Sequence, residues 1–360
     1  IHALGGDTFI DVSTSLSWTA ELENPVADSW ITLSGSSGNG NGSLKATAGF
    51  HNSGYPRLAK VIITGTDGNS KEVTELYITQ NGVDIPDAEF RAYLANSRYI
   101  ELADGNVKTI TGTGLELTTI YIPGSSSLKD LTGIEYFSNL QEIQCQGSGI
   151  SEIDLSRNAK LLRLNFSTTG LRELDLSNNP ELLSLDCYNT NMQSIDVRDC
   201  KKLLVLNISK TDIQSVDLSQ NTSLIRFECH TTNISTLNLS RNGALESLDC
   251  SNTKITNLDL TGTTSLTHLT VNGPKLTSLD VSGHPKLGTL ACYGNTALAS
   301  LNISNCRELS SIVLFEPENE DGGDEDHDHD HETPENNSID INGILNLTPP
   351  ETEHTNPYKN

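Results

Sequence analysis

The acidic and histidine side chains of this chain occur in patterns that could bind cations. Between residues 316 and 337 three aspartates alternate with three histidines, namely Asp326, His327, Asp328, His329, Asp330 and His331. Imidazole and carboxylate groups are both ligands of zinc and related metals. A flexible run of alternating ligands binds metal weakly and with little selectivity, so we favour a solvated acidic loop. Weak zinc or calcium binding is the alternative.

A second set of carboxylates recurs every 21 residues. It comprises Asp154, Asp175, Asp196, Asp217, Asp259 and Asp280, with Asn238 and Asn302 at two of the positions. If residues 21 apart are spatial neighbours, like charges about 5 Å apart repel unless they are hydrogen bonded. One interpretation is a cation-binding ridge. Because Asn substitutes for Asp and Ser follows in most units, we favour carboxylates that accept bonds from that Ser or from a backbone amide.

A third column varies in chemistry from unit to unit and is the candidate binding surface. It contains Gln144, Asn165, Asp186, Asn207, Glu228, Asp249, Thr270 and Ala291, flanked by Tyr188, His230 and Tyr293. Aromatic rings beside amide and carboxylate groups can stack on a sugar, or can form part of a protein contact. A variable face on a rigid scaffold is where binding sites are usually built. An ordinary polar solvent face is the other interpretation.

Motifs for catalysis are absent from the sequence. It contains no paired nucleophile and base, no His-Glu-x-x-His motif and no phosphate-binding glycine loop. The histidines His230, His268 and His284 fall at different positions of the 21-residue unit. We therefore expect a non-catalytic protein without a cofactor.

The seven cysteines are expected to be buried thiols. Five of them share one position of the unit, which Phe166, Ile208 and Val271 fill elsewhere: Cys145, Cys187, Cys229, Cys250 and Cys292. Free cysteine behaves as a small buried hydrophobe. Cys145, Cys187 and Cys229 lie two units apart, about 10 Å, which is beyond the reach of a disulfide.

Composition and charge exclude some partners. Apolar residues make up 35% and aromatic residues 5% of the chain, which fits a thin, elongated β architecture. The net charge of −24 argues against a nucleic-acid partner, which needs a basic stripe. No stretch approaches the roughly 18 apolar residues of a membrane span. The chain begins within a strand-like pattern, so we expect a trimmed mature form.

The strongest pattern is a leucine at one position of successive units: Leu140, Leu161, Leu182, Leu203, Leu224, Leu245, Leu266, Leu287 and, one residue late, Leu309. Self-similarity at this period predicts a stacked solenoid over residues 140–315. The unit L-x-x-L-x-C-x-x-x-x-I-x-x-L-D-L-S-x-N-x-x resembles the short bacterial class of leucine-rich repeats. Its Asn, at positions 158, 179, 221 and 242, should bond exposed backbone at the turn between rungs. The replacements Cys200, Thr263, His284 and Cys306 should make weaker turns.

Residues 1–82 predict a small all-β, Ig-like sandwich. Six strands are expected at 8–12, 16–20, 30–33, 44–48, 58–64 and 73–79, separated by Gly, Ser and Asn clusters such as residues 35–42. The order of features resembles the BACON domain, common at the N-termini of Bacteroidetes surface proteins. The matching residues are 30–33, 44–47, Asn52, Arg57, 60–63 and 79–82.

Two segments should cover the ends of the solenoid core. Residues 83–139 are expected to form the junction and N-terminal cap, with a short helix that Asp87 caps and that carries Phe90, Tyr93 and Leu94. This segment resembles the N-terminal cap of Bacteroidetes leucine-rich repeat proteins. Residues 338–347 alternate in polarity, and we expect this strand, the first part of the C-terminal segment 338–360, to pack on the last rung.

The expected fold is therefore mainly β, a sandwich followed by a solenoid with little helix. The two resemblances imply a Bacteroidetes protein that is extracellular or held at the outer-membrane surface, either secreted or lipid-anchored. They imply recognition of a host or bacterial surface protein, with glycan or mucin binding as the alternative. We expect a monomer.

Overall fold

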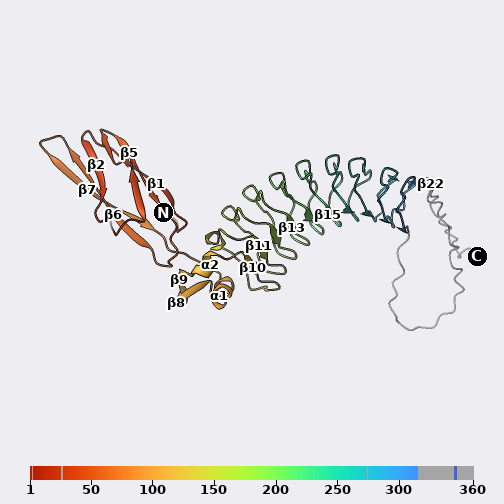
Figure 1. Ribbon diagram of the computed structural model, residues 1–360, viewed down its shortest axis with the longest axis horizontal. Coiled ribbons are helices and arrows are strands. Elements are labelled where there is room, and N and C mark those ends of the chain that lie inside the picture. The colour runs from red at the N-terminus through yellow and green to blue at the C-terminus, as the bar shows by residue number, and fades with distance from the viewer. Residues whose placement is uncertain (2, 26, 274, 315–343, 347–360) are drawn as a thin grey trace, which may run out of the picture.

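The computed structural model describes residues 1, 3–25, 27–273, 275–314 and 344–346. In this part of the chain a two-sheet β-sandwich at the N-terminus leads into a curved solenoid (Figure 1). Within the described ranges, helix is confined to short segments at the junction. The predicted fold class, a sandwich followed by a leucine-rich repeat solenoid, is confirmed.

The sandwich consists of two antiparallel sheets. The first has the order β1 (Gly6–Val12), β5 (Gly42–Ala48), β3 (Ile31–Ser34), and the second β4 (Ser37–Asn39), β2 (Ser17–Leu22), β6 (Arg57–Thr66), β7 (Lys71–Gln80). Trp18, Leu44 and Val61 are among the residues buried between them. All six predicted strands are present, with somewhat different ends.

The prediction of a plain turn at residues 35–42 is wrong, because β4 lies within it. Its glycines make room for Trp18: a Cβ atom at Gly38 or Gly42 would lie 2.7 Å from that indole ring. The indole Nε1 donates to the carbonyl of Gly40 at 2.9 Å. The glycine-rich composition therefore reflects packing against a buried ring as well as turn formation.

The junction contains helix α1 (Ala88–Asn96), the hairpin β8 (Ile100–Ala103) and β9 (Asn106–Ile110), helix α2 (Gly112–Leu115) and a 3-10 turn at Ile134–Tyr136. As predicted, Asp87 caps α1, and its Oδ1 accepts the Phe90 amide hydrogen at 2.9 Å. The hairpin also contacts the sandwich, because the Gly54 amide donates to the Lys108 carbonyl and the Ile110 amide to Asn52. Backbone hydrogen bonds thus join the sandwich to the solenoid cap.

The solenoid is built on a parallel sheet of ten three-residue strands, one from each successive rung. In order they are β10 (Thr119–Tyr121), β11 (Glu142–Gln144), β12 (Arg163–Asn165), β13 (Ser184–Asp186), β14 (Val205–Asn207), β15 (Arg226–Glu228), β16 (Ser247–Asp249), β17 (His268–Thr270), β19 (Thr289–Ala291) and β21 (Ser311–Val313). Leu164 pairs with Leu185, and Leu185 with Leu206. Residues one repeat apart are therefore stacked in register, as predicted.

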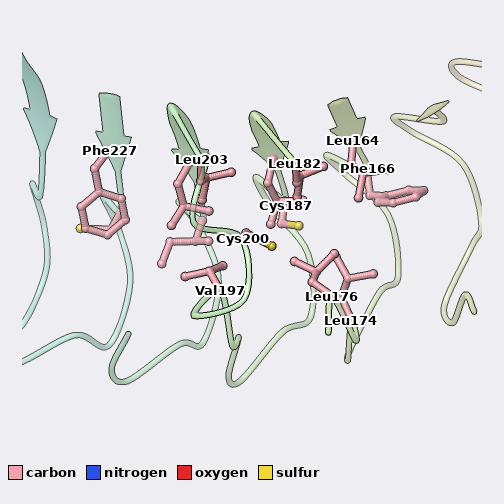
Figure 2. Close-up of a cluster of buried hydrophobic side chains, with 14 of the residues drawn as sticks. Leu164, Phe166, Leu174, Leu176, Leu182, Cys187, Val197, Cys200, Leu203 and Phe227 are labelled. Atoms are coloured by element: carbon pink, nitrogen blue, oxygen red, sulfur yellow. The ribbon is translucent and has the colours of Figure 1, made fainter. Parts of the chain in front are cut away.

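The interior is a continuous file of repeat leucines with cysteine and aromatic residues beside it. Leu182 and Leu203 lie in successive rungs of this file, and Cys187 lies near Phe166 (Figure 2). All seven cysteines are buried free thiols, which confirms the prediction. Burial raises the pKa of Cys145, Cys250 and Cys292 to about 12, so these thiols stay protonated at neutral pH.

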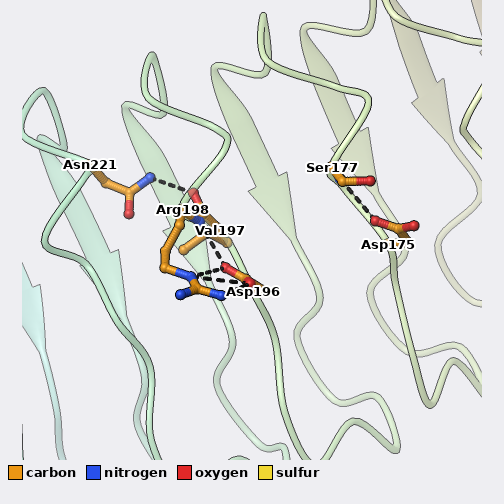
Figure 3. Close-up of polar contacts among 6 residues, drawn as sticks. All are labelled: Asp175, Ser177, Asp196, Val197, Arg198 and Asn221. Carbon is orange, nitrogen blue, oxygen red and sulfur yellow. Dashed lines mark hydrogen bonds and ion pairs between the residues drawn. The ribbon is translucent and has the colours of Figure 1, made fainter.

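The asparagines of the repeat also lie inside the coil, and the prediction that they bond exposed backbone is wrong. Asn158, Asn179, Asn221 and Asn242 are fully buried. Asn221 Nδ2 donates to the carbonyl of Val197 at 2.9 Å (Figure 3). It also donates to the carbonyl of Cys200 at 2.8 Å, and both acceptors lie in the preceding rung. This ladder supplies donors to carbonyls that stacking removes from water.

The residues that replace Asn keep the same turn. Their amides donate three residues back, as for Cys200 to Val197 at 3.0 Å and Thr263 to Leu260 at 2.9 Å, close to the Asn158 value of 3.0 Å. Their side chains differ: Cys200 Sγ reaches the Asn179 carbonyl at 3.7 Å, whereas Thr263 Oγ1 bonds Leu260 in its own rung. His284 and Cys306 still reach the preceding rung: His284 Nε2 lies 3.1 Å from the Leu260 carbonyl, and Cys306 Sγ lies 3.1 Å from the Val281 carbonyl.

A second, smaller sheet forms at the C-terminal end. It contains β18 (Ser278–Asp280), β20 (Ser300–Asn302) and β22 (Ile344–Asn346), and β22 pairs antiparallel with β20. β22 is the described portion of segment 338–360, the expected capping segment. The Asp/His tract at residues 326–331, and with it the proposed metal ligands, lies outside the described residues.

Candidate binding face of the solenoid

The ten-stranded sheet lies along the inner side of the solenoid's arc (Figure 1). The middle residue of each strand, such as Leu164, Leu185 or Leu206, is buried in the core. Side chains alternate along a strand, so the first and third residues project to the outside of the sheet. We call this surface the inner face. The predicted variable column, from Gln144 to Ala291, is the third strand position and forms one file on it.

Part of this column also has a structural task that sequence reasoning missed. The Oδ1 atoms of Asn165, Asp186, Asn207 and Asp249 each accept the amide hydrogen of the residue two positions later, at 2.9–3.0 Å. Short polar side chains do this at turns. Asn and Asp are therefore interchangeable for the turn and differ in the charge that they present on the inner face.

A shallow groove of about 310 Å³ crosses the inner face from β11 to β15. Arg163 and Glu142 lie on one side of it, with 4.0 Å between Nη1 and Oε2. Arg226 and Glu228 lie on the other, with 3.5 Å between Nη1 and Oε1. The short side chains of β13 and β14 form the floor between them: Ser184, Asp186, Val205 and Asn207. Sequence reasoning missed both arginines because it considered only the third strand position.

Asp186 is the carboxylate on this floor. Its Oδ1 accepts the Tyr188 amide hydrogen at 2.9 Å. Among the described residues, no Lys or Arg forms an ion pair with it, in contrast to Glu142 and Glu228. Partial burial raises the pKa of the Asp186 carboxyl, and the hydrogen bond from Tyr188 only partly opposes this.

An aromatic cluster lies beside the groove. The rings of Tyr188 and His230 come from rungs two repeats apart, yet their centroids are 6.0 Å apart, with 57° between the planes. The Lys210 ammonium lies 5.1 Å from the Tyr188 ring centroid, within the range of a cation–π contact. Ser209, in the rung between them, is fully buried, and its Oγ has no hydrogen-bond partner among the described atoms.

The third predicted aromatic residue, Tyr293, belongs to the same file but lies much farther along the solenoid. Its amide donates to Asn272 Oδ1 at 3.1 Å. The structure therefore brings Tyr188 and His230 together and leaves Tyr293 apart from them. Tyr121, which sequence reasoning missed, is 56% exposed and pairs with Gln144 at the first strand of the sheet. The short strand before the repeat was not predicted, so this ring was not assigned to the inner face.

The Asp column lies on a different side of the coil, and the structural interpretation of it is confirmed. Asp175 Oδ1 accepts the Ser177 amide hydrogen at 2.9 Å (Figure 3). Arg198 donates to both carboxylate oxygens of Asp196 and lowers its pKa to about 2. Within the described ranges, no group of three or more His, Cys, Asp or Glu side chains has a geometry that could hold a metal ion.

The conformation of the turn after each inner strand is shared by successive rungs. The residue that follows Tyr188, and its equivalents, has a positive φ: Gly147, Thr168, Asn189, Lys210, Thr231, Asn252, Gly273 and Gly294. The next residue is often a buried Thr whose hydroxyl donates three residues back, as in Thr190 to Cys187 at 2.9 Å and Thr211 to Ile208 at 2.7 Å. These two features position the aromatic cluster, and the recurring Thr was visible in the sequence.

None of the helices in the described part of the chain is long and apolar enough to cross a bilayer. No protein-family model matches the sequence, and neither does any curated protein.

The chain is similar to solved structures that contain leucine-rich repeats, among them the following three. The functional domain of InlJ from Listeria monocytogenes, which includes a cysteine ladder, is 28% identical, with 62% of this chain and 61% of that chain covered and a TM-score of 0.38. A leucine-rich repeat protein of Leptospira interrogans is 17% identical, with coverage of 51% and 50% and a TM-score of 0.48. The ectodomain of the Arabidopsis thaliana receptor kinase GASSHO1/SCHENGEN3, in complex with CASPARIAN STRIP INTEGRITY FACTOR 2, is 17% identical, with coverage of 56% and 32% and a TM-score of 0.39. The chain thus covers less than two thirds of each of these structures.

Proposed function

We propose that this chain is a non-catalytic, extracellular or surface-held protein that recognises another protein through the inner face of its solenoid. The observation that carries the proposal is the groove between Arg163 and Arg226, with the Tyr188–His230 cluster beside it. Both arginine side chains are 58% exposed. Arginine and tyrosine are the residue types that contribute most often to binding energy at protein interfaces.

The scaffold supports this use in two ways. Ten strands at about 4.8 Å spacing give a face about 45 Å long, so a partner can contact several rungs at once. The backbone of each strand is fixed by parallel pairing with its neighbours. Binding to such a face orders little additional backbone, so less binding free energy is lost as conformational entropy.

Glycan binding is the alternative, and one arrangement favours it. Tyr188 is half-buried and follows Asp186 by two residues, which puts an aromatic ring and a hydrogen-bonding group in one turn. The sequence resemblance of residues 1–82 to the BACON domain of Bacteroidetes surface proteins points to glycan or mucin as well. In either case the sandwich would serve as a spacer or accessory module. Divalent-metal binding by residues 326–331 is a third, separate proposal.

A matched pair of variants tests the use of the inner face. Ser184 lies on the groove floor, and Ser194 lies on another side of the same rung. Proteins selected from a displayed library for binding to the wild-type chain should lose binding to Ser184→Arg and keep it with Ser194→Arg. A glycan array is probed with the same two variants. Selected proteins that bind all three chains equally, or a glycan signal abolished by Ser184→Arg with no protein binder found, would overturn protein recognition here.

A further inference from the structure

The groove floor carries a carboxylate that has no counter-ion among the residues that the structure describes. Glu142 and Glu228 have arginine partners at the two edges, whereas the described chain provides none for Asp186 between them. Partial burial makes the charged form of this group costly, as the raised pKa of Asp186 shows. A carboxylate that is desolvated and unpaired gains more from an added cation than a fully solvated carboxylate does.

The shape around Asp186 is suited to one long side chain. From β12 to β15 the sheet spans about 14 Å. The long residues Arg163 and Arg226 border this span, and the short residues Ser184 and Val205 leave it open. Tyr188 follows Asp186 by two residues, and its ring already has one cation, the Lys210 ammonium, 5.1 Å from the centroid. This contact illustrates the attraction between a tyrosine ring and a positive group.

We infer that this groove is a subsite for a guanidinium side chain, in which Asp186 is the counter-ion and Tyr188 offers an aromatic edge or face for stacking. The inference rests on the proposed function and adds the chemistry of the partner: a protein that presents an exposed arginine. Guanidinium is favoured over ammonium because it is planar, forms paired bonds with a carboxylate and stacks on aromatic rings.

The variant Asp186→Asn isolates the charge. Asn165 and Asn207 occupy the same strand position and bond the same turn amide, so an Asn at 186 keeps the backbone bond and the fold. Asp249→Asn is the control, because it removes the same charge from an equivalent turn outside the groove. Thermal unfolding of all three chains verifies that they are folded.

The probe is N-acetyl-arginine amide, with N-acetyl-citrulline amide as its neutral isostere. The methyl NMR signals of Val205, on the groove floor, report occupancy. We expect saturable shifts in the wild type with a dissociation constant of about 1–10 mM. Asp249→Asn should bind within twofold of this, and Asp186→Asn at least tenfold more weakly. Citrulline should produce no saturable shift.

The second variant Ser184→Arg supplies a guanidinium from the chain itself and should also abolish binding of the probe. Absence of saturation in the wild type, equal binding of citrulline, or binding to Asp186→Asn within twofold of the wild type would overturn the subsite. If library-selected proteins depend on Ser184 but tolerate Asp186→Asn, the proposed function holds and the subsite is wrong. If the probe binds as expected but no protein binder is found, the subsite holds and protein recognition is wrong.

Discussion

The ring of Tyr188 lies 6.0 Å from the ring of His230, although their rungs are separated by that of Ser209. Two parallel spacings put the backbones about 10 Å apart, so the rings lean toward each other over the intervening residue. Ser209, in the rung between the two rings, is fully buried. Its Oγ has no partner among the described atoms, which makes the hydroxyl a cost to the folded state.

Ser209→Ala is therefore expected to be neutral or stabilising, by up to about 1 kcal/mol, because it removes a desolvated hydroxyl that makes no bond. Chemical denaturation measures the free energy of unfolding. Thr211→Ala is the control, since its hydroxyl donates to the Ile208 carbonyl at 2.7 Å and its removal should destabilise the protein by about 1–3 kcal/mol. Loss of more than about 1 kcal/mol in Ser209→Ala would mean that the hydroxyl has a partner.

Asp186 and Asp196 lie in one rung, but their ionisation should change the free energy of unfolding in opposite directions as pH rises. The pKa of Asp186 is raised by burial, so its ionisation disfavours the folded state. This cost is absent below the unfolded value of 3.8 and develops as pH rises through the folded pKa. Asp186→Asn should therefore stabilise the protein at pH 7, by less than about 1 kcal/mol since the group is partly solvated, and should have no effect near pH 3.

For Asp196 the sign is reversed, because Arg198 lowers its pKa from 3.8 to about 2. Its stabilising contribution is present above 3.8 and is lost as pH falls toward 2. Asp196→Asn should thus destabilise slightly at pH 7 and not at pH 2; the group is exposed, so the effect is small. Thermal unfolding of both variants across this pH range checks the two signs. If the stability change of both variants varied with pH in the same direction, burial of Asp186 and pairing of Asp196 with Arg198 could not be the causes of their pKa shifts.

The solenoid could be predicted from the sequence because its determinant is local and periodic. A leucine at each 21-residue step buries a side chain only if the rungs stack, as Leu164, Leu185 and Leu206 do in register. The cap at Asp87 was predictable for the same reason, since the bond to Phe90 spans three residues.

Contacts between distant segments were not predictable from the pattern. β4 contains Gly38 and β5 begins at Gly42, and Trp18 packs on both glycines from another strand. The pairing of Tyr188 with His230 depends on rotamers across two rungs, which periodicity does not specify. The groove arose from first-position arginines next to short residues at 184 and 205. The periodic pattern therefore predicts which residues share a column. The length and pairing of the side chains determine which part of the columns forms a groove.

Thr231 should be replaceable by glycine with a gain in stability. Its φ is 56°, a left-handed conformation that is strained for a β-branched residue. Glycine occupies the equivalent turn at Gly147, Gly273 and Gly294 without this strain. Thr231→Gly is expected to stabilise by about 1 kcal/mol, and Asn189→Gly by less, because Asn tolerates the left-handed region better. Denaturation midpoints compare the two, and a destabilised Thr231→Gly would contradict the idea of strain.

The buried asparagine ladder should contribute far more to stability than the exposed polar residues beside it. Asn179 Nδ2 donates to the carbonyls of Leu155, at 3.2 Å, and Asn158, at 3.1 Å, whereas Asn178 is exposed and its Nδ2 donates to Ser177 Oγ. Asn179→Ala leaves two buried carbonyls without that donor, but it also removes Asn179 Oδ1, which has no hydrogen-bond partner among the described atoms. The net cost should be about 1–3 kcal/mol. Asn178→Ala should change stability by less than about 0.5 kcal/mol.

Hydrogen exchange can show which rungs are destabilised in Asn179→Ala and by how much. Each rung contacts only its neighbours, so the weakened interface in Asn179→Ala should raise exchange first at the rungs around 155–185 and less toward β19. Asn179→Thr should fall between the wild type and Asn179→Ala, because Thr263 at the equivalent position bonds a carbonyl of its own rung. Equal stability of Asn179→Ala and Asn178→Ala, or exchange that rises uniformly along the coil, would show that the ladder does not hold neighbouring rungs together.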